Sequence, residues 1–358
     1  MKRVARSVRA AAALAVAGLL TASLTACVQS GRTDQSRGGG EQVACPVAVD
    51  ETFTGTVRLG YQEIPNGDLI VKDAGLLETC LPKATITWSK FASGATVIQA
   101  FGSNSLDLGL LGSAAAARAL SAPLHIGMRA VWIHDVIGAA ESLVVKDPAI
   151  TSVAGLRGKK VAVPFASTSH YSLLAALTAA GVEREVTLVN MQPDAIAAAW
   201  RGGDIDAAFI WEPTLSELVK NGHVVTTAAE TAKAGKPTYD LAGARSEFVT
   251  ANPRFLEVWT AAQNWAVTLI NTAPDSAATR ISAQLGVPVA DIRKQLGEYG
   301  YLDATAQAGP GYLGKQLGAD LKSSADFLLS QGEIQGLAAP EAYAGAVYAG
   351  AATKVSAK

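Results

Sequence analysis

Hydrophobic and polar positions follow two alternating periods along most of the chain, one typical of strands and one typical of helices. Short β-type runs alternate with helical stretches from residue 57 to residue 244, an order that indicates an α/β fold with largely parallel sheets. The predicted strands are residues 57–62, 84–89, 106–111, 124–132, 142–146, 160–164, 186–190, 205–211, 224–227 and 239–244. The helices predicted among them are residues 68–78, 94–101, 168–180 and 193–201.

The predicted strands fall into two units, the second running from residue 142 to residue 244. After Arg245 the pattern changes to helices alone, predicted at residues 253–271, 277–285, 289–296 and 313–331, so we expect the chain to return and cap the first unit. Two α/β lobes joined by crossing segments leave a cleft between them, and ligands of open α/β sheets bind outside the carboxyl ends of the strands. The alanine-rich end, residues 340–358, is predicted as a weak helix without an evident task.

The first residues are typical of a targeting segment and are set aside from the fold. Lys2, Arg3, Arg6 and Arg9 precede the apolar run 11–20, the layout of a signal peptide, and the run is shorter than the roughly 20 residues of a spanning helix. Residues 24–27, Leu-Thr-Ala-Cys, resemble the lipobox of bacterial lipoproteins. The resemblance implies cleavage of residues 1–26 and lipidation of Cys27; the alternative is an ordinary signal peptide with a coincidental cysteine.

The expected organisation follows from these boundaries. Residues 27–45 form a lipid anchor and flexible linker, because residues 31–41 are polar and Gly-rich. Residues 46–140 form the first part of lobe 1, residues 141–244 form lobe 2, and residues 245–358 return to lobe 1 as its helical C-terminal part. We therefore predict an exported protein held by its lipid at the outer face of the cell membrane.

Composition is that of a globular protein, with 49% hydrophobic and 17% charged residues among 358. Cleavage of the signal peptide removes four basic residues and no acid from totals of 30 and 31, which leaves a net charge of −5 and no indication of nucleic acid. Cys45 and Cys80 are then the remaining cysteines, and in an exported chain we expect them to form a disulfide. Two buried thiols are the alternative.

Three segments share a local arrangement that suits the binding of a small anion. Residues 91–94, 111–114 and 165–170 each lead from a predicted strand through small polar residues into a predicted helix. The backbone N–H groups and the positive dipole end of a helix N-terminus bind anions, and Ser or Thr hydroxyls add donors without adding charge. A sulfonate would fit such a site, although each Ser or Thr could serve only as a helix N-cap.

A zwitterionic ligand would also need a partner for its cation. Glu141, Glu212 and Asp240 are the candidate acids, and Trp211 offers a cation–π contact. On pattern alone an acid beside a strand is equally a solvated or capping group, and Trp211 is equally a core residue. His125, His134 and His223 have no metal-ligand spacing, no Gly-x-Ser-x-Gly elbow occurs, and we expect no metal, no cofactor and no catalysis.

Three stretches carry a resemblance to a known family. Residues 88–95 (WSKFASGA), 161–177 (VAVPFASTSHYSLLAAL) and 197–207 (AAAWRGGDIDA) look like the taurine-binding proteins of taurine ABC importers, and the similarity extends from about residue 57 to about residue 249. The resemblance implies a two-lobed periplasmic-type solute-binding protein of the Venus-flytrap type II, a monomer that closes on its ligand by a hinge. Its partners would be the permease and ATPase subunits of the importer.

The resemblance also assigns roles to individual residues. The sulfonate would sit against Ser113 and the turn from Thr168 to His170, with Gln62 on the wall of the first lobe. The ammonium would meet Asp240 and Glu141 beside Trp211, an assignment made because a carboxylate facing a sulfonate would repel it. A capping or packing role remains the alternative for His170.

The sequence departs from the family pattern at three places, namely at residues 114–115 (Ala-Ala), at residues 241–242 (Leu-Ala) and where Trp211 precedes Glu212. A longer or differently substituted amino-sulfonate is therefore an alternative ligand. The wider group binds aliphatic sulfonates, nitrate and thiamine precursors, so another anion of this kind, including a sulfate ester, is the alternative ligand. An enzyme built on the same fold is the alternative of another class.

Overall fold

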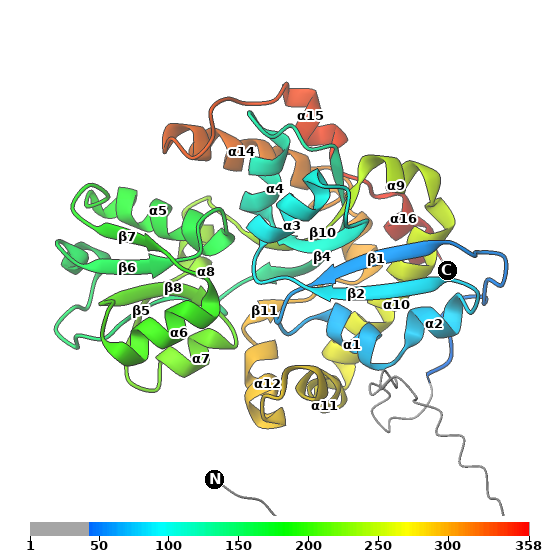
Figure 1. Ribbon diagram of the computed structural model, residues 1–358, viewed down its shortest axis with the longest axis horizontal. Helices are drawn as coiled ribbons and strands as arrows, with labels where there is room; N and C mark the ends of the chain where they lie inside the picture. The colour runs from blue at the N-terminus through cyan, green and yellow to red at the C-terminus, as the bar shows by residue number, and fades with distance from the viewer. Residues whose placement is uncertain (1–42, 358) are drawn as a thin grey trace, which may run out of the picture. The chain divides into compact units, whose positions relative to one another are not determined.

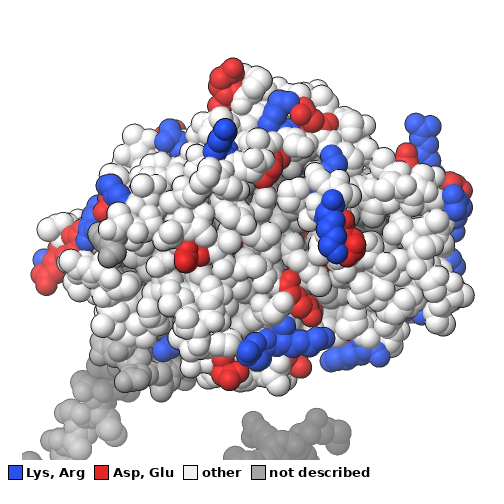
Figure 2. Space-filling view, turned by 180° about the vertical axis from the view of Figure 1, so that it is seen from behind, with Lys and Arg blue, Asp and Glu red and all other residues white. Residues whose placement is uncertain are grey.

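The structure is a computed structural model that describes residues 43–357 (Figure 1). The predicted signal peptide, Cys27 and most of the predicted linker lie outside the described residues. Within residues 43–357, no helix combines the length and the apolar character needed to cross a membrane. Basic and acidic side chains are interspersed on the face seen in Figure 2, so that face offers no continuous positive surface.

Two sheets organise the described chain. The first sheet has the order β11-β4-β10-β3-β1-β2, with β1 parallel to β2 and β3, and β10 antiparallel to both of its neighbours. Its strands are β1 (Thr56–Tyr61), β2 (Thr85–Lys90), β3 (Leu108–Gly112), β4 (Met128–Ile137), β10 (Tyr239–Arg245) and β11 (Tyr299–Gly300).

The second sheet has the order β7-β6-β8-β5-β9, with β6 parallel to both neighbours and β5 antiparallel to both. Its strands are β5 (Glu141–Val145), β6 (Lys160–Val163), β7 (Thr187–Asn190), β8 (Ala207–Trp211) and β9 (His223–Thr227). We call each sheet with its helices a lobe.

Helices cover both sheets (Figure 1). Those of the second lobe are α5 (Thr168–Ala180), α6 (Pro193–Gly202), α7 (Thr214–Leu218) and α8 (Ala228–Lys233), with the 3-10 turn η1 (Val153–Leu156). The first lobe has helices from two parts of the chain. Those that precede the second lobe in sequence are α1 (Gly67–Asp73), α2 (Leu76–Cys80), α3 (Gly94–Gly102) and α4 (Ser113–Leu120). Those that follow the second lobe in sequence are α9 (Ser246–Ala251), α10 (Pro253–Thr272), α11 (Pro274–Leu285), α12 (Val289–Leu296), α13 (Ala304–Ala308), α14 (Gln316–Ser330), α15 (Pro340–Gly345) and α16 (Gly350–Ser356).

The helical C-terminal part packs on the first lobe, as predicted. Trp132 of β4 and Trp259 of α10 are fully buried in one hydrophobic core, which also takes in Tyr343 of α15. The second lobe builds its core on both faces of its sheet, around Trp200 on one face and Phe209 on the other. Burial of such large side chains supplies most of the hydrophobic stabilisation of each lobe.

One predicted strand lies in the other sheet. Residues 239–244 were expected to close the second unit, but β10 inserts between β3 and β4 of the first sheet, so that prediction was wrong. A period-2 pattern shows that a strand forms but does not say which sheet it joins. Gly243 favours this central place, because a Cβ there would lie 2.6 Å from Cδ2 of Leu111 and 2.7 Å from Cε of Met128.

Strand β4 also differs from its prediction and has an unusual outer edge. It begins at Met128 and not at residue 124, and it continues to Ile137. On the side away from β10, strand β11 pairs only with residues 136–137. Further along, the side-chain amide of Gln307 accepts from Ile133 N at 2.7 Å and donates to Ile133 O at 2.9 Å.

The alanine-rich end continues this edge. Ala130 donates its N–H to Ala346 O at 2.7 Å and accepts from Tyr348 N at 2.9 Å. The segment between α15 and α16 therefore pairs with β4, and two short helices replace the predicted weak one. This gives the tail the structural task that the sequence did not show.

Two further contacts hold distant parts of the chain. A disulfide joins Cys45 to Cys80 at the end of α2, with the two Cα atoms 5.2 Å apart. Helix α14 of the first lobe reaches the second lobe, where the ring of Phe327 lies edge-on to Tyr171 at 5.1 Å and under Lys236 Nζ at 4.5 Å. The C-terminal part thus touches both lobes.

Candidate functional site

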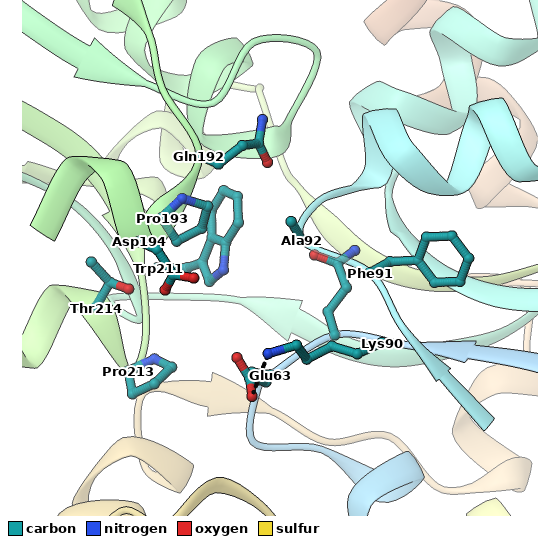
Figure 3. Close-up of a pocket in the computed structure, with 11 residues that line it drawn as sticks. Glu63, Lys90, Phe91, Ala92, Gln192, Pro193, Asp194, Trp211, Pro213 and Thr214 are labelled. Atoms are coloured by element: carbon teal, nitrogen blue, oxygen red, sulfur yellow. Dashed lines mark hydrogen bonds and ion pairs between the residues drawn. The ribbon is translucent and has the colours of Figure 1, made fainter. Parts of the chain in front are cut away.

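A cavity of about 120 Å³ opens between residues of the two lobes (Figure 3). The first lobe contributes residues that end or follow β1 and β2, and the second contributes residues that end or follow β7 and β8. They are Gln62, Glu63, Lys90, Phe91 and Ala92 on one side, and Gln192, Pro193, Asp194, Trp211, Pro213 and Thr214 on the other. This is the position outside the strand ends where open α/β sheets bind ligands.

The cavity carries charges of both signs. Lys90 Nζ lies 3.2 Å from Glu63 Oε1, and this contact raises the pKa of Lys90, with Asp194 adding a weaker attraction. Pro193 begins α6, so the positive end of a ten-residue helix also faces this region. A cavity with a lysine, a helix N-terminus and two carboxylates can hold a small zwitterion.

Two of the residues predicted for the site line this cavity. Gln62 is buried, and its Nε2 donates to Leu110 O at 2.9 Å. Trp211 ends β8 and presents its indole to the cavity, as Figure 3 shows. Gln62 thus lies on the wall of the first lobe, and Trp211 offers an aromatic surface from the second.

Four other predicted residues come together beside the cavity without lining it. Thr168 Oγ1, at the start of α5, donates to Glu141 Oε1 at 2.6 Å. A Cβ on Gly112 would lie 2.6 Å from Thr168 Cγ2, so the two lobes touch there. Asp240 pairs with Gly112 across the sheet, and Ser113 Oγ accepts from Tyr239 N at 3.2 Å.

The structure does not keep the predicted sulfonate and ammonium ends of the ligand site apart. The sequence analysis assigned Ser113 and Thr168 to the sulfonate end of the ligand. It assigned Glu141 and Asp240 to the ammonium end, as a separate part of the site. The structure joins them, because the hydroxyl of Thr168 donates to the carboxylate of Glu141.

A third carboxylate, missed by the sequence reasoning, completes the group. Asp135 lies on β4 directly opposite Asp240 and is fully buried. Burial raises the pKa of Glu141 to about 8, with Asp240 adding repulsion, and burial raises the pKa of Asp240 to about 7. Burial and the charges of Asp240 and Glu141 also raise the pKa of Asp135. The signal was an acid within a β-type run, hidden because the predicted strand stopped at residue 132.

His170 lies away from the cavity. Its ring stacks on Phe165 with centroids 4.4 Å apart, its Nδ1 is 3.4 Å from Ala166 N, and the same atom is 3.9 Å from Glu333 Oε2. Burial and the nearby Arg118 lower its pKa to about 4, so the ring is neutral at pH 7. The packing role that the sequence left as an alternative fits this geometry.

Glu212 has a structural contact of its own. Its carboxylate accepts from Ser216 N at 3.0 Å and from Ser216 Oγ at 2.8 Å, in the first turns of α7. Burial raises the pKa of Glu212 to about 7. Of the three candidate acids, Glu212 therefore acts as a local cap.

Sequence reasoning missed all three charged residues that line the cavity, namely Glu63, Lys90 and Asp194. The available signal was at residues 190–193, where β7 leads through a polar residue into a helix that starts with proline, the same arrangement as in the three segments identified. Within residues 43–357, no three His, Cys, Asp or Glu side chains are arranged to hold a metal ion.

Comparisons with known proteins place this geometry in context. The family model for the substrate-binding domain of the ABC-type glycine betaine transport system matches residues 55–276, more than half of the chain. The taurine-binding periplasmic protein of Escherichia coli (strain K12) is 34% identical over 262 residues, which cover 71% of this chain and 80% of that protein.

Solved structures show the same fold at lower identity. The alkanesulfonate-binding protein from Xanthomonas axonopodis pv. citri bound to MOPS superimposes with a TM-score of 0.67 at 23% identity, covering 84% of this chain and 99% of that chain. The desulfurization enzyme DSZB superimposes with a TM-score of 0.60 at 17% identity, covering 85% of this chain and 99% of that one, so the fold by itself does not decide between binding and catalysis. The match to the family model and the 34% identity show that the chain belongs to the family of ABC-transporter substrate-binding proteins that includes the taurine-binding periplasmic protein.

Proposed function

We propose that the protein captures taurine or a related small sulfonate outside the cytoplasm and delivers it to the permease of an ABC importer. The observation that carries the proposal is the cavity between the lobes, which combines Lys90, two carboxylates and Trp211 in one small space. Such a lining suits a short molecule with an anionic end, an apolar middle and a cationic end. The relatives named above, a taurine-binding and an alkanesulfonate-binding protein, support the same ligand class.

The anionic end of the ligand is best accommodated at Lys90. An ammonium group and the free N–H groups at the start of α6 are charge-assisted donors for sulfonate oxygens. The side-chain amides of Gln62 and Gln192 add neutral donors, and Trp211 can cover the methylene groups. This moves the sulfonate away from Ser113 and Thr168, because the hydroxyl of Thr168 already donates to Glu141 and is not free for a sulfonate oxygen.

The setting of the protein is part of the proposal. Cleavage after residue 26 and lipidation of Cys27 would hold a monomer at the outer face of the cell membrane, with residues 27–45 as its tether. The permease and ATPase subunits would be its partners. The chain crosses between the lobes at residues 138–140 and 234–238, and these crossings would let the two lobes close on the ligand by a hinge.

Binding and not catalysis is the proposed role. The enzyme that shares the fold is only 17% identical, whereas the taurine-binding relative is 34% identical over most of both chains. A different anion of the same group, such as nitrate, a sulfate ester or a thiamine precursor, is the alternative ligand.

Calorimetric titration tests the proposal. The chain from residue 28 onward is titrated with taurine, ethanesulfonate, nitrate and a sulfate ester, and we expect one or both sulfonates to bind most tightly. Lys90→Met should weaken sulfonate binding by at least about tenfold, because a charge-assisted contact is lost. Lys83→Met, a control on an exposed lysine paired with Glu51, should leave binding unchanged.

Tight binding of nitrate or the sulfate ester with no binding of either sulfonate would refute the named ligand class. Unchanged affinity in the Lys90 variant would refute the assigned place of the sulfonate.

A further inference from the structure

A histidine and an aspartate face each other inside the first lobe, and neither of them lines the cavity. Nε2 of His134 lies 3.4 Å from Oδ2 of Asp68, and both side chains are at most 1% exposed. The contact joins β4 to α1 through the core, where the ring of Trp259 on α10 lies edge-on to His134 at 6.0 Å. The two facing atoms are too close for a water to lie between them, so they are direct neighbours.

The contact is closely packed and has no other polar partner. Within residues 43–357, Oδ2 of Asp68 and both ring nitrogens of His134 have no hydrogen-bond partner. Oδ1 of Asp68 accepts from Nε2 of Gln263 on α10 at 2.6 Å. A Cβ on Gly67 would lie 2.4 Å from Oε1 of the same glutamine, so this approach requires glycine. A net charge buried here would be costly, and a proton between Asp68 and His134 removes that charge.

The charge state of the pair follows from burial. Burial raises the pKa of Asp68 to about 7, against the hydrogen bond from Gln263, and burial lowers the pKa of His134 to about 3. Below pH 7 the pair therefore consists of a protonated carboxyl group and a neutral imidazole. No charged side chain of the surrounding elements in the described chain shifts either pKa appreciably, namely Lys72 and Asp73 on α1, Glu78 on α2, Arg254 on α10, Arg280 on α11 and Asp135 on β4.

On one side the pair is connected to the wall of the cavity. Gln62 and Glu63 line the cavity, and residues 64–66 lead from them directly into α1. Asn66 caps this helix by accepting from Asp68 N at 2.9 Å. A shift of Asp68 is therefore passed along the turn of residues 62–66 to two side chains of the site.

On the other side the pair is connected to a bulge in β4. Strand β10 pairs Asp240 with Asp135 and Leu241 with Ile133, which leaves His134 as an extra residue without a partner. A bulge bends its strand and re-aims the side chains, and bulges are common next to functional sites. The contact of the His134 ring with α1 holds this bulge from the core.

We propose that Asp68 and His134 are positioning residues of the ligand site, which hold the turn of residues 62–66 against the bulge of β4 through a proton shared between them. The inference rests on the proposed function and extends it to side chains that do not touch the ligand. In the neutral pair, Asp68 donates to Nε2 of His134, and the ring carries its own hydrogen on Nδ1. Loss of the shared proton leaves an ionised carboxylate in the core, so the turn is held less firmly and the affinity for the ligand falls.

The pH dependence of binding tests the positioning role, with taurine or ethanesulfonate as the probe, whichever binds the wild type more tightly. Asp68→Asn keeps the shape and the donor but cannot lose a proton. It should match the wild-type affinity at pH 6, whereas between pH 6 and 9 the wild type should lose about threefold to tenfold more affinity than the variant, as for one hydrogen bond. Glu141 and Asp240 titrate in both proteins, so the difference between the two profiles isolates Asp68.

Two histidine variants complete the comparison. His134→Phe keeps a ring but removes the acceptor for the shared proton, so it should weaken binding already at pH 6 by about threefold to tenfold. His223→Phe is the matched control, because His223 on β9 of the second lobe contacts Ile150 O at 2.8 Å and is remote from the cavity. It should leave the affinity and its pH profile unchanged.

Nitrogen NMR of the histidine rings in the wild type observes the shared proton without any substitution. The ring of His134 should stay neutral and move its hydrogen from Nδ1 to Nε2 as the pH rises through about 7. A charged imidazole at pH 7, a hydrogen that stays on one nitrogen, or equal pH profiles for the wild type and Asp68→Asn would overturn the inference and leave a sulfonate-binding protein. Failure of both sulfonates, nitrate and the sulfate ester to bind would overturn the proposed function, and with it the positioning role.

Discussion

Gly112 and Thr168 touch across the lobes, and a single methyl group at Gly112 should interfere with closure. The backbone of Gly112 has φ −68° and ψ 156°, which alanine adopts without strain. The added Cβ would lie 2.6 Å from Thr168 Cγ2, about 1 Å closer than two carbon atoms normally approach. Gly112→Ala should therefore penalise the closed arrangement and leave each lobe intact.

The size of the effect follows from the cost of overpacking. Inserting a methyl group into a filled space costs about 1 to 3 kcal/mol. If the lobes close on the ligand, this penalty appears in full in the binding free energy and weakens affinity by about 5-fold to 150-fold. Calorimetric titration with the tightest ligand measures it, and thermal unfolding without ligand should change little.

The double variant Gly112→Ala with Thr168→Ser is the decisive control. Serine lacks the Cγ2 atom that causes the overlap and keeps the hydroxyl that donates to Glu141, so affinity should return toward the wild-type value. Gly109→Ala places its Cβ 2.8 Å from Leu106 Cδ2, inside the first lobe. That variant should lower the unfolding temperature and should not respond to Thr168→Ser. Wild-type affinity in the single Gly112 variant, or no recovery in the double variant, would refute the reasoning.

Three further predictions concern stability and closure. Replacing Cys45 and Cys80 by serine should lower the free energy of unfolding by about 4 kcal/mol in denaturant titration, because their disulfide closes a loop of 35 residues; a loss below 1 kcal/mol would contradict the loop-entropy account. Burial raises the pKa of Glu141 from 4.5 to about 8 and that of Asp240 from 3.8 to about 7, so the folded protein holds protons that the unfolded chain releases. The contribution of these two groups to the stability of the ligand-free protein is therefore fully present below about pH 4 and is lost as the pH rises to 8. An unfolding temperature that climbs between pH 5 and 8 would argue against this. Phe327→Ala removes an aromatic contact between α14 and the second lobe worth about 1 kcal/mol, so ligand affinity should fall several-fold, and unchanged affinity would exclude α14 from closure.

The alternation of strands and helices was sufficient to predict the α/β class and most elements. Helix α10 was predicted to within one residue, because its length and apolar period are those of a buried helix. Strand β10 was assigned to the wrong unit, since pairing between strands far apart in sequence depends on packing that no local pattern contains.

The site was predictable only in part. Gln62 and Trp211 could be placed because each ends or follows a strand that carries the family resemblance. Asp135 could not be identified, because its significance depends on its register with Asp240, more than a hundred residues away. The role of His170 was left open for the same reason, since Glu333, which lies 3.9 Å from its ring, is far away in the sequence.

The outer edge of β4 has a consequence for solubility and for protein engineering. A strand with free N–H and C=O groups is a template for pairing with another molecule, and proteins protect such edges. Here Gln307 and the segment from Ala346 to Tyr348 occupy the groups that β11 is too short to reach. Shortening the chain before residue 340 would expose this template and favour intermolecular β-pairing and aggregation, whereas a reporter domain fused after the last helix would leave the edge covered.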